Sequence, residues 1–267
     1  MDFFKPIERI VQKGVIEVLP NFITNSKVKD LLVKGGKFYA IWDERVGMWS
    51  TSELIAQELI DIGLANYRES MTVPDGYKVV VKFAKGSVFS TWKSFKTYMS
   101  LLPDSKETLD DNLTFLNTEV TLKSYASKRL PYSLQEGDIS AYDEIISTLY
   151  DADERTKIEW AIGSVISGDS KKIQKFLVLF GDAGTGKSTI LNIIEQLFSD
   201  YTSTFDAKSL TSSSATFSME SFKSNPLVCI QHDGDLSKIE DNTKMNSIVS
   251  HELMSINEKY KSSYSAR

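Results

Sequence analysis

The sequence predicts an α/β protein whose C-terminal part is a P-loop (AAA+-like) parallel-sheet core. Three observations support this class: the apolar run at residues 176–180, the stretch Gly-Asp-Ala-Gly-Thr-Gly-Lys-Ser at residues 181–188, and apolar residues at helical spacing directly after it. A continuous apolar run is typical of a parallel strand buried on both faces. We expect a helical segment and a small α+β domain to precede this core.

Residues 1–104 are predicted to form the small α+β domain. Short strand-like segments occur at residues 37–42 and 79–81, and a polar turn lies at residues 43–47. A proline followed by two turn-forming residues interrupts the pattern at residues 103–105. We therefore expect a domain boundary there.

Residues 105–170 are predicted to be a helical linker or collar. Its first amphipathic helix has apolar residues at Ile139, Tyr142, Ile145, Ile146 and Leu149. A second helix has its apolar face at Ile158, Ala161, Ile162 and Val165, and ends near Gly168. Residues 171–267 would then form the ATPase core, which we expect to be incomplete at its C-terminal end.

Composition narrows the functional classes. The chain has 267 residues, 41% of them apolar, and a net charge of −5. No apolar run approaches the roughly 20 residues that span a bilayer, and the start lacks a signal peptide pattern, so we expect a cytoplasmic protein without a membrane partner. The single cysteine, Cys229, excludes an internal disulfide and is expected in the core. With His232 and His251 it forms neither zinc-ligand spacing nor a hydrolase triad.

The glycine-rich stretch predicts a site for ATP and Mg²⁺. Glycines let successive backbone N–H groups turn toward a polyphosphate, and the following helix adds its positive end. Lys187 would reach the β- and γ-phosphates, and the Ser188 hydroxyl would be a ligand of Mg²⁺. The residues expected to bind the nucleotide are Gly181, Asp182, Ala183, Gly184, Thr185, Gly186, Lys187, Ser188 and Thr189.

A second acidic site is expected 46 residues after Lys187. Residues 227–230 form a short apolar strand, and Asp233 and Asp235 follow it, where the end of a parallel strand would meet the phosphate loop. Asp233 is the stronger candidate for holding the metal, and Asp235 or Glu220 for orienting the attacking water. The alternative is that both aspartates are ordinary turn residues.

With both sites in place, residues 113–267 resemble the superfamily 3 helicases, specifically the primase-helicase proteins of bacteriophages and large DNA viruses. The matching features are residues 113–118, the Walker A loop, a Walker B-like strand and the basic stretch Asn257-Glu-Lys-Tyr-Lys261. In that family the basic stretch belongs to a hairpin that grips single-stranded DNA, and Lys259 and Lys261 match it. The resemblance implies a hexameric ring that works with other replication proteins, in the host cytoplasm if phage-encoded.

The chain also departs from that family. The sensor asparagine and arginine finger, which follow the basic stretch in the family, have no counterpart before Arg267. The usual adjacent acidic pair is replaced by Asp233-Gly-Asp235. Slow turnover is the expected consequence.

A second basic segment lies at residues 77–98. Five lysines and no acidic residue occur there, interleaved with aromatic residues: Lys78, Lys82, Lys85, Lys93 and Lys96, with Phe83, Phe89, Trp92 and Phe95. Lysines with exposed aromatics could bind single strands. The alternative is that the aromatics pack inward beneath a solvated basic face.

The preferred function is an ATP-dependent DNA helicase that moves along single-stranded DNA. An ATP-switched DNA-binding, helicase-loading or origin-binding protein without efficient turnover is the alternative. A phosphate-loop kinase is disfavoured because no basic lid for a second substrate is evident.

Overall fold

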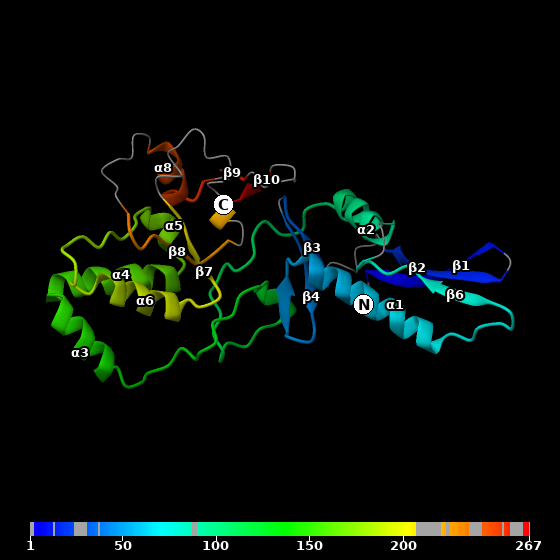
Figure 1. Ribbon diagram of the computed structural model, residues 1–267, viewed down its shortest axis with the longest axis horizontal. Helices are drawn as coiled ribbons and strands as arrows, with labels where there is room; N and C mark the ends of the chain where they lie inside the picture. Colours follow the sequence, from blue (N-terminus) through cyan, green and yellow to red (C-terminus); the bar gives the residue numbers. More distant parts are fainter. Residues whose placement is uncertain are drawn as a thin grey trace. The chain divides into compact units, whose positions relative to one another are not determined.

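The structure is a computed structural model of the chain, and it divides into two compact units. It describes residues 3–12, 14–23, 31–36, 38–86, 90–206, 220–222, 225–234, 242–252, 254–256 and 264–266. Unit 1 comprises Met1–Asp111 and Glu119–Ser127, and unit 2 comprises Asn112–Thr118 and Lys128–Arg267. Figure 1 labels the helices and strands of both units.

Unit 1 contains two small sheets. The first has the order β1-β2-β6: β1 (Phe4–Gln12) and β2 (Val15–Phe22) are antiparallel, and β6 (Lys78–Val81) runs parallel to β2. The turn between β1 and β2 contains Gly14 at φ 79°, a conformation that glycine adopts without a Cβ penalty. The second sheet is an antiparallel meander of β3 (Leu32–Lys34), β4 (Tyr39–Asp43) and β5 (Met48–Ser50).

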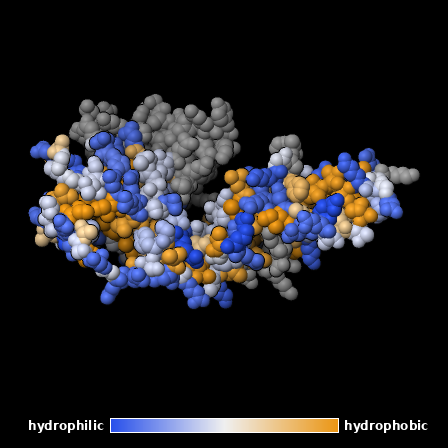
Figure 2. Space-filling model, turned by 60° about the horizontal axis from the view of Figure 1, so that its bottom comes forward, coloured by the Kyte–Doolittle hydropathy of each residue, from blue (hydrophilic) through white to orange (hydrophobic). Residues whose placement is uncertain are grey.

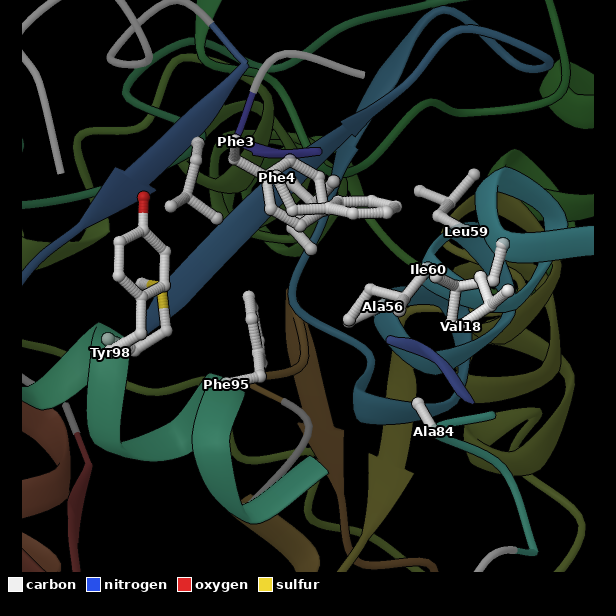
Figure 3. Close-up of a cluster of buried hydrophobic side chains, with 13 residues drawn as sticks. Phe3, Phe4, Val18, Ala56, Leu59, Ile60, Ala84, Phe95 and Tyr98 are labelled. Atoms are coloured by element: carbon white, nitrogen blue, oxygen red, sulfur yellow. The ribbon is translucent and has the colours of Figure 1, made fainter. Parts of the chain in front are cut away.

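Two helices complete the core of unit 1. Helix α1 (Glu53–Ser70) starts after Ser52, and α2 (Ser90–Leu101) follows β6. Aromatic side chains dominate the core, and Figure 3 shows Phe3 and Phe4 near Ile60 of α1, with Phe95 projecting from α2. Burial of such large apolar surfaces is the main source of stability in a small α+β unit.

The segment 119–127 belongs to unit 1 and contacts Trp49 there. The Trp49 indole Nε1 donates a hydrogen bond to the carbonyl of Leu122 at 2.9 Å, and its ring stacks on Tyr125 with centroids 5.8 Å apart. The short 3₁₀ helix η2 (Leu122–Ser124) lies in this segment. The two compact units divide after Asp111, and residues 119–127 return to unit 1. The domain boundary expected at residues 103–105 stays a prediction.

Unit 2 contains α3 (Ser140–Leu149), α4 (Ala152–Ile166), α5 (Ser170–Ile173), α6 (Lys187–Leu197), η3 (Glu220–Phe222) and α8 (Thr243–Val249). Strands β7 (Thr202–Thr204) and β8 (Val228–Ile230) are parallel, and β9 (Met254–Ile256) and β10 (Tyr264–Ala266) are antiparallel. The core joins Ile146, Ile158, Ile190 and Ile194 from α3, α4 and α6 with Ile230 of β8. Asp151 caps α4 and accepts the Glu154 N–H at 2.8 Å.

Most of the predicted local elements are confirmed. The helices expected from Ile139, from Ile158 and after the glycine-rich stretch are α3, α4 and α6, and Gly168 lies just beyond the end of α4. The strands expected at residues 79–81 and 227–230 are β6 and β8. Within the described residues, no helix has both the length and the apolar character needed to cross a membrane.

One predicted strand is wrong in this structure. Residues 174–180 have no regular secondary structure, and Phe176, Val178 and Phe180 are 56%, 51% and 99% exposed. A strand needs a neighbouring strand, and among the described residues β8 is paired with β7. An apolar run encodes a preference for burial but not the partner, so a parallel sheet around the glycine-rich loop stays a prediction. On the face shown in Figure 2, hydrophobic residues (orange) lie at the surface between hydrophilic residues (blue).

Candidate phosphate-binding site

The glycine-rich loop makes a tight turn directly before α6. Gly181, Gly184 and Gly186 have φ values of 153°, 83° and 80°. Side chains with a Cβ rarely adopt these values, so glycine at these positions permits the observed path. The bend is thus a property of the local sequence.

The loop curls around the ammonium group of Lys187. Its Nζ donates hydrogen bonds to the carbonyl oxygens of Gly181 at 2.9 Å and Asp182 at 2.6 Å, and to the Thr185 hydroxyl at 3.3 Å. Thr185 in turn donates to the Asp182 carbonyl at 3.0 Å. The positive charge is therefore held at the centre of the loop, where a bound anion could exchange with the carbonyl oxygens.

The first turn of α6 offers donors for an anion. Gly186 is the N-cap and has no side chain to accept the first N–H groups, which the helix itself cannot pair. Ser188 and Thr189 are exposed in this turn. Unpaired N–H groups, the helix dipole and a lysine together fit a polyphosphate, and the Ser188 hydroxyl fits a Mg²⁺ ligand.

Leu149, a residue outside the loop, packs against Gly186, the last glycine of the loop. A Cβ built on Gly186 would lie 2.6 Å from Cδ1 and 2.7 Å from Cδ2 of Leu149, so the Leu149 side chain packs directly on the glycine backbone. Leu149 ends α3, and the next residue, Tyr150, packs against the core of unit 2 with its hydroxyl buried and lacking a hydrogen-bond partner. Sequence periodicity placed Leu149 on an apolar face but gave no signal for this contact.

Strand β8 carries the predicted acidic residue Asp233 just past its end. Asp233 is exposed, and the Gln231 Nε2 donates to its carbonyl oxygen at 3.3 Å. Within the described residues, no hydrogen bond joins a carboxylate to Lys187 or Ser188, and no cluster of three potential metal ligands from His, Cys, Asp and Glu occurs. The role of Asp233 at a metal stays a prediction.

The same region contains a contact that sequence reasoning missed. His232 Nε2 lies 2.9 Å from Glu195 Oε1, which joins the end of β8 to the middle of α6. These residues are 37 positions apart, so no local pattern could reveal the pair. It fixes the segment that leads to Asp233 against the helix that starts at the loop.

Several predicted site residues lie outside the described residues. Asp235, Lys259 and Lys261 belong to this group, and Glu220 is described only as the start of η3. Cys229 lies in β8, where burial raises the pKa of its thiol to about 12. This agrees with the expectation of a core residue.

The basic and aromatic segment at residues 77–98 divides in the structure. Phe95 is fully buried, Trp92 is half-buried and Phe83 is 36% exposed, while Phe89 lies outside the described residues. Lys82 pairs with Glu17 at 2.9 Å and Lys96 with Glu53 at 3.1 Å. Inward packing thus accounts for Phe95, and Trp92 is left at the surface of the core.

Residues 179–267 match the model of a family of unknown function (DUF5906). The matched region starts two residues before Gly181, and so it includes the whole glycine-rich loop, α6, β8 and the segment with Lys259 and Lys261. No curated protein matches the chain. The glycine-rich loop, β8 and Asp233 thus all lie within the matched region, and the family's description assigns no activity.

Proposed function

We propose that this chain is a P-loop ATPase of the superfamily 3 helicase type, which hydrolyses ATP and moves along single-stranded DNA. The observation that carries the proposal is the loop of three positive-φ glycines around the Lys187 ammonium, at the uncapped start of α6. This combination supplies backbone donors, a helix dipole and a point charge to one polyphosphate.

In the proposed reaction, water attacks the γ-phosphorus of ATP and the bond to the β–γ bridging oxygen breaks, which releases ADP and phosphate. Lys187 exchanges the Gly181 and Asp182 carbonyls for phosphate oxygens and stabilises the charge that develops on them. Ser188 and Asp233 would hold Mg²⁺, which neutralises phosphate charge when bound. Asp235 or Glu220 would orient the water.

The proposed assembly is a homo-oligomeric ring, a hexamer, in the cytoplasm, with single-stranded DNA held by Lys259 and Lys261. The ring would act with other replication proteins, in a bacterial host if the chain is phage-encoded. The family resemblance of residues 113–267 supports this part of the proposal.

A second function is an ATP-switched DNA-binding or helicase-loading protein. One observation favours it: the Lys187 ammonium is bound to the Gly181 and Asp182 carbonyls, so a phosphate that takes their place would change the conformation of the loop. Such a site could bind ATP without activating water. Binding would then control assembly instead of translocation.

The test is Mg²⁺-ATP hydrolysis with and without single-stranded DNA, by the wild-type chain, Lys187→Ala and the control Lys172→Ala. Lys172 is an exposed lysine that pairs with Asp169 at 2.6 Å, outside the loop. DNA-stimulated turnover that is lost only in Lys187→Ala supports the helicase. ATP-dependent oligomers without turnover, measured by sedimentation, support the switch. Absence of both ATP binding and turnover would overturn the P-loop assignment.

A further inference from the structure

Helix α2 of unit 1 carries an open groove that the proposed ATPase site does not use. The groove has a volume of about 620 Å³ and is lined by Trp92, Lys93, Lys96, Thr97 and Ser100. These positions follow one another along one side of the helix, over about 12 Å at 1.5 Å per residue. None of the lining residues is acidic.

Trp92 forms a rigid floor for this groove. Its ring stacks on the fully buried Phe95, with centroids 5.1 Å apart and an angle of 22°, and meets Tyr39 edge-on at 6.5 Å. Figure 3 shows Phe95 projecting from α2 among the core side chains. A ring that is already fixed loses little conformational entropy when a planar ligand stacks on it.

The two lysines supply exchangeable positive charge. Lys96 Nζ lies 5.6 Å above the centroid of the Trp92 ring and 3.1 Å from the Glu53 carboxylate, and both charged side chains are about half exposed. Exposed pairs of this kind contribute little net stability, so a phosphate can replace the carboxylate at small cost. No ion pair holds Lys93 within the described part of the chain.

The hydroxyl groups of the groove are already committed. Thr97 donates to the Lys93 carbonyl at 3.0 Å, and Ser100 donates to the Thr97 carbonyl at 2.7 Å. They cannot donate to a ligand without breaking these bonds. Recognition in the groove therefore depends on one aromatic face and two cations.

We propose that this groove binds single-stranded nucleic acid: Lys96 moves from above the Trp92 ring to a phosphate, a base stacks on the ring in its place, and Lys93 pairs with an adjacent phosphate. An acidic peptide would satisfy the lysines but would leave the aromatic face unused, whereas an unpaired nucleotide uses both. Stacking and phosphate pairing are independent of base identity, so binding does not depend on sequence. This site is separate from the phosphate loop and from Lys259 and Lys261.

The experiment is a fluorescence anisotropy titration of labelled oligo-dT, without nucleotide, on the full chain carrying Lys259→Ala and Lys261→Ala. In this background, Lys93→Ala with Lys96→Ala is compared with the matched pair Lys5→Ala with Lys123→Ala, two exposed lysines on β1 and η2 of the same unit. We expect the groove pair to weaken binding about tenfold at low salt and to flatten the slope of log K against log salt by about 1.4. The control pair should change both the affinity and the salt slope by less than the groove pair does.

Trp92→Leu gives a second measurement that separates stacking from charge. We expect the affinity for oligo-dT to fall about fivefold or more. We also expect Trp92→Leu to lose the quenching of tryptophan fluorescence that oligo-dT causes in the Lys259→Ala, Lys261→Ala background. Circular dichroism and thermal unfolding show whether Trp92→Leu is folded. If it is not, the comparison of the two lysine pairs tests the proposal. Equal effects of the two lysine pairs, or binding of poly-glutamate as tight as that of oligo-dT, would overturn the proposal.

Lys187→Ala keeps the two proposals distinguishable. It should abolish nucleotide-dependent behaviour and leave nucleotide-free binding in the groove unchanged. Oligo-rU and oligo-dU of equal length should bind the groove equally well, because none of the proposed contacts involves the 2′-hydroxyl.

Discussion

Lys187 is the residue on which the proposed site depends most. Its ammonium group is bound by two carbonyl oxygens and a hydroxyl of its own loop, so its charge is already located where phosphate would bind. The enclosing loop also explains why lysine is needed: a shorter side chain could not reach both carbonyls from the first turn of α6.

Lys187→Ala should abolish tight Mg²⁺-ATP binding while the fold remains intact. The loss should be at least about tenfold, because a charged hydrogen bond contributes roughly 1.5–3 kcal/mol. Isothermal calorimetry measures the affinity, and Lys172→Ala is the control for a lost surface charge. Equal affinity of wild type and Lys187→Ala for Mg²⁺-ATP would contradict the assignment of this loop as the ATP-binding site.

Cys229 provides a residue-scale test of the core. Burial raises its thiol pKa to about 12, so the reactive thiolate is scarce near neutral pH. We expect slow modification by a thiol reagent at pH 8 in the folded protein and fast modification in denaturant. Rapid labelling of the folded protein would show that β8 is open to solvent.

At the scale of elements, the end of α3 and the start of α6 are coupled through Leu149 and Gly186. Gly186→Ala adds a Cβ at φ 80° and places it 2.6 Å from Leu149. We expect this variant to lose more than the roughly 1–2 kcal/mol that left-handed backbone costs a residue other than glycine. Adding Leu149→Ala removes the clash, so the double variant should lose less stability than the sum of the single variants.

Gly184→Ala is the matched control for that cycle. Gly184 has φ 83°, but a Cβ there meets no atom within 4 Å. The changes in the free energy of unfolding caused by Gly184→Ala and by Leu149→Ala should therefore be additive. The free energies of unfolding from denaturant titrations test both cycles, and additivity at Gly186 would contradict the proposed contact.

A second element-scale feature is the carboxylate that joins three strands of unit 1. Glu17 on β2 accepts a hydrogen bond from Arg9 on β1 at 2.8 Å and pairs with Lys82, beyond the end of β6, at 2.9 Å. These side-chain hydrogen bonds from Arg9 and Lys82 lower the pKa of Glu17, against a smaller opposing effect of burial.

A lowered pKa in the folded state has a defined consequence for stability. The contribution of Glu17 is complete above the pKa of the unfolded chain, near 4.5, and is lost as the pH falls through the lower folded value. Glu17→Gln should therefore destabilise the protein at pH 7, and its difference from wild type should shrink below about pH 4. Urea midpoints across this range check the prediction, and a constant difference would contradict it.

At the scale of the whole molecule, two predicted contacts with single strands lie in different units: the groove on α2 in unit 1, and Lys259 and Lys261 in unit 2. Each would neutralise phosphates independently of the other. A chain with net charge −5 could bind nucleic acid only through such local clusters.

Lys259→Ala with Lys261→Ala should weaken binding of single-stranded DNA and lower the salt slope by about 1.4, since each single-strand phosphate contributes about 0.7. The measurement is the dissociation constant across a range of salt concentrations. Lys157→Ala, which removes an exposed lysine from α4, is the control. An unchanged slope would remove these lysines from the DNA-binding surface.

The sequence by itself determined the local features of this protein. Glycine spacing specified the turn of the glycine-rich loop, and apolar spacing specified α3, α4 and α6, because both signals act within a few residues. The short apolar run at residues 228–230 likewise became β8. These features could be predicted because backbone conformation and amphipathic periodicity are local properties.

Only the tertiary structure decided which distant residues meet. It packed Leu149 on Gly186, paired His232 with Glu195 and buried Phe95 beneath Trp92. Among the residues that the structure describes, it gave residues 176–180 no neighbouring strand. Each outcome depends on pairing or packing with partners far apart in the chain. An apolar residue carries a tendency toward burial, but the surface that buries it exists only once the whole chain has folded.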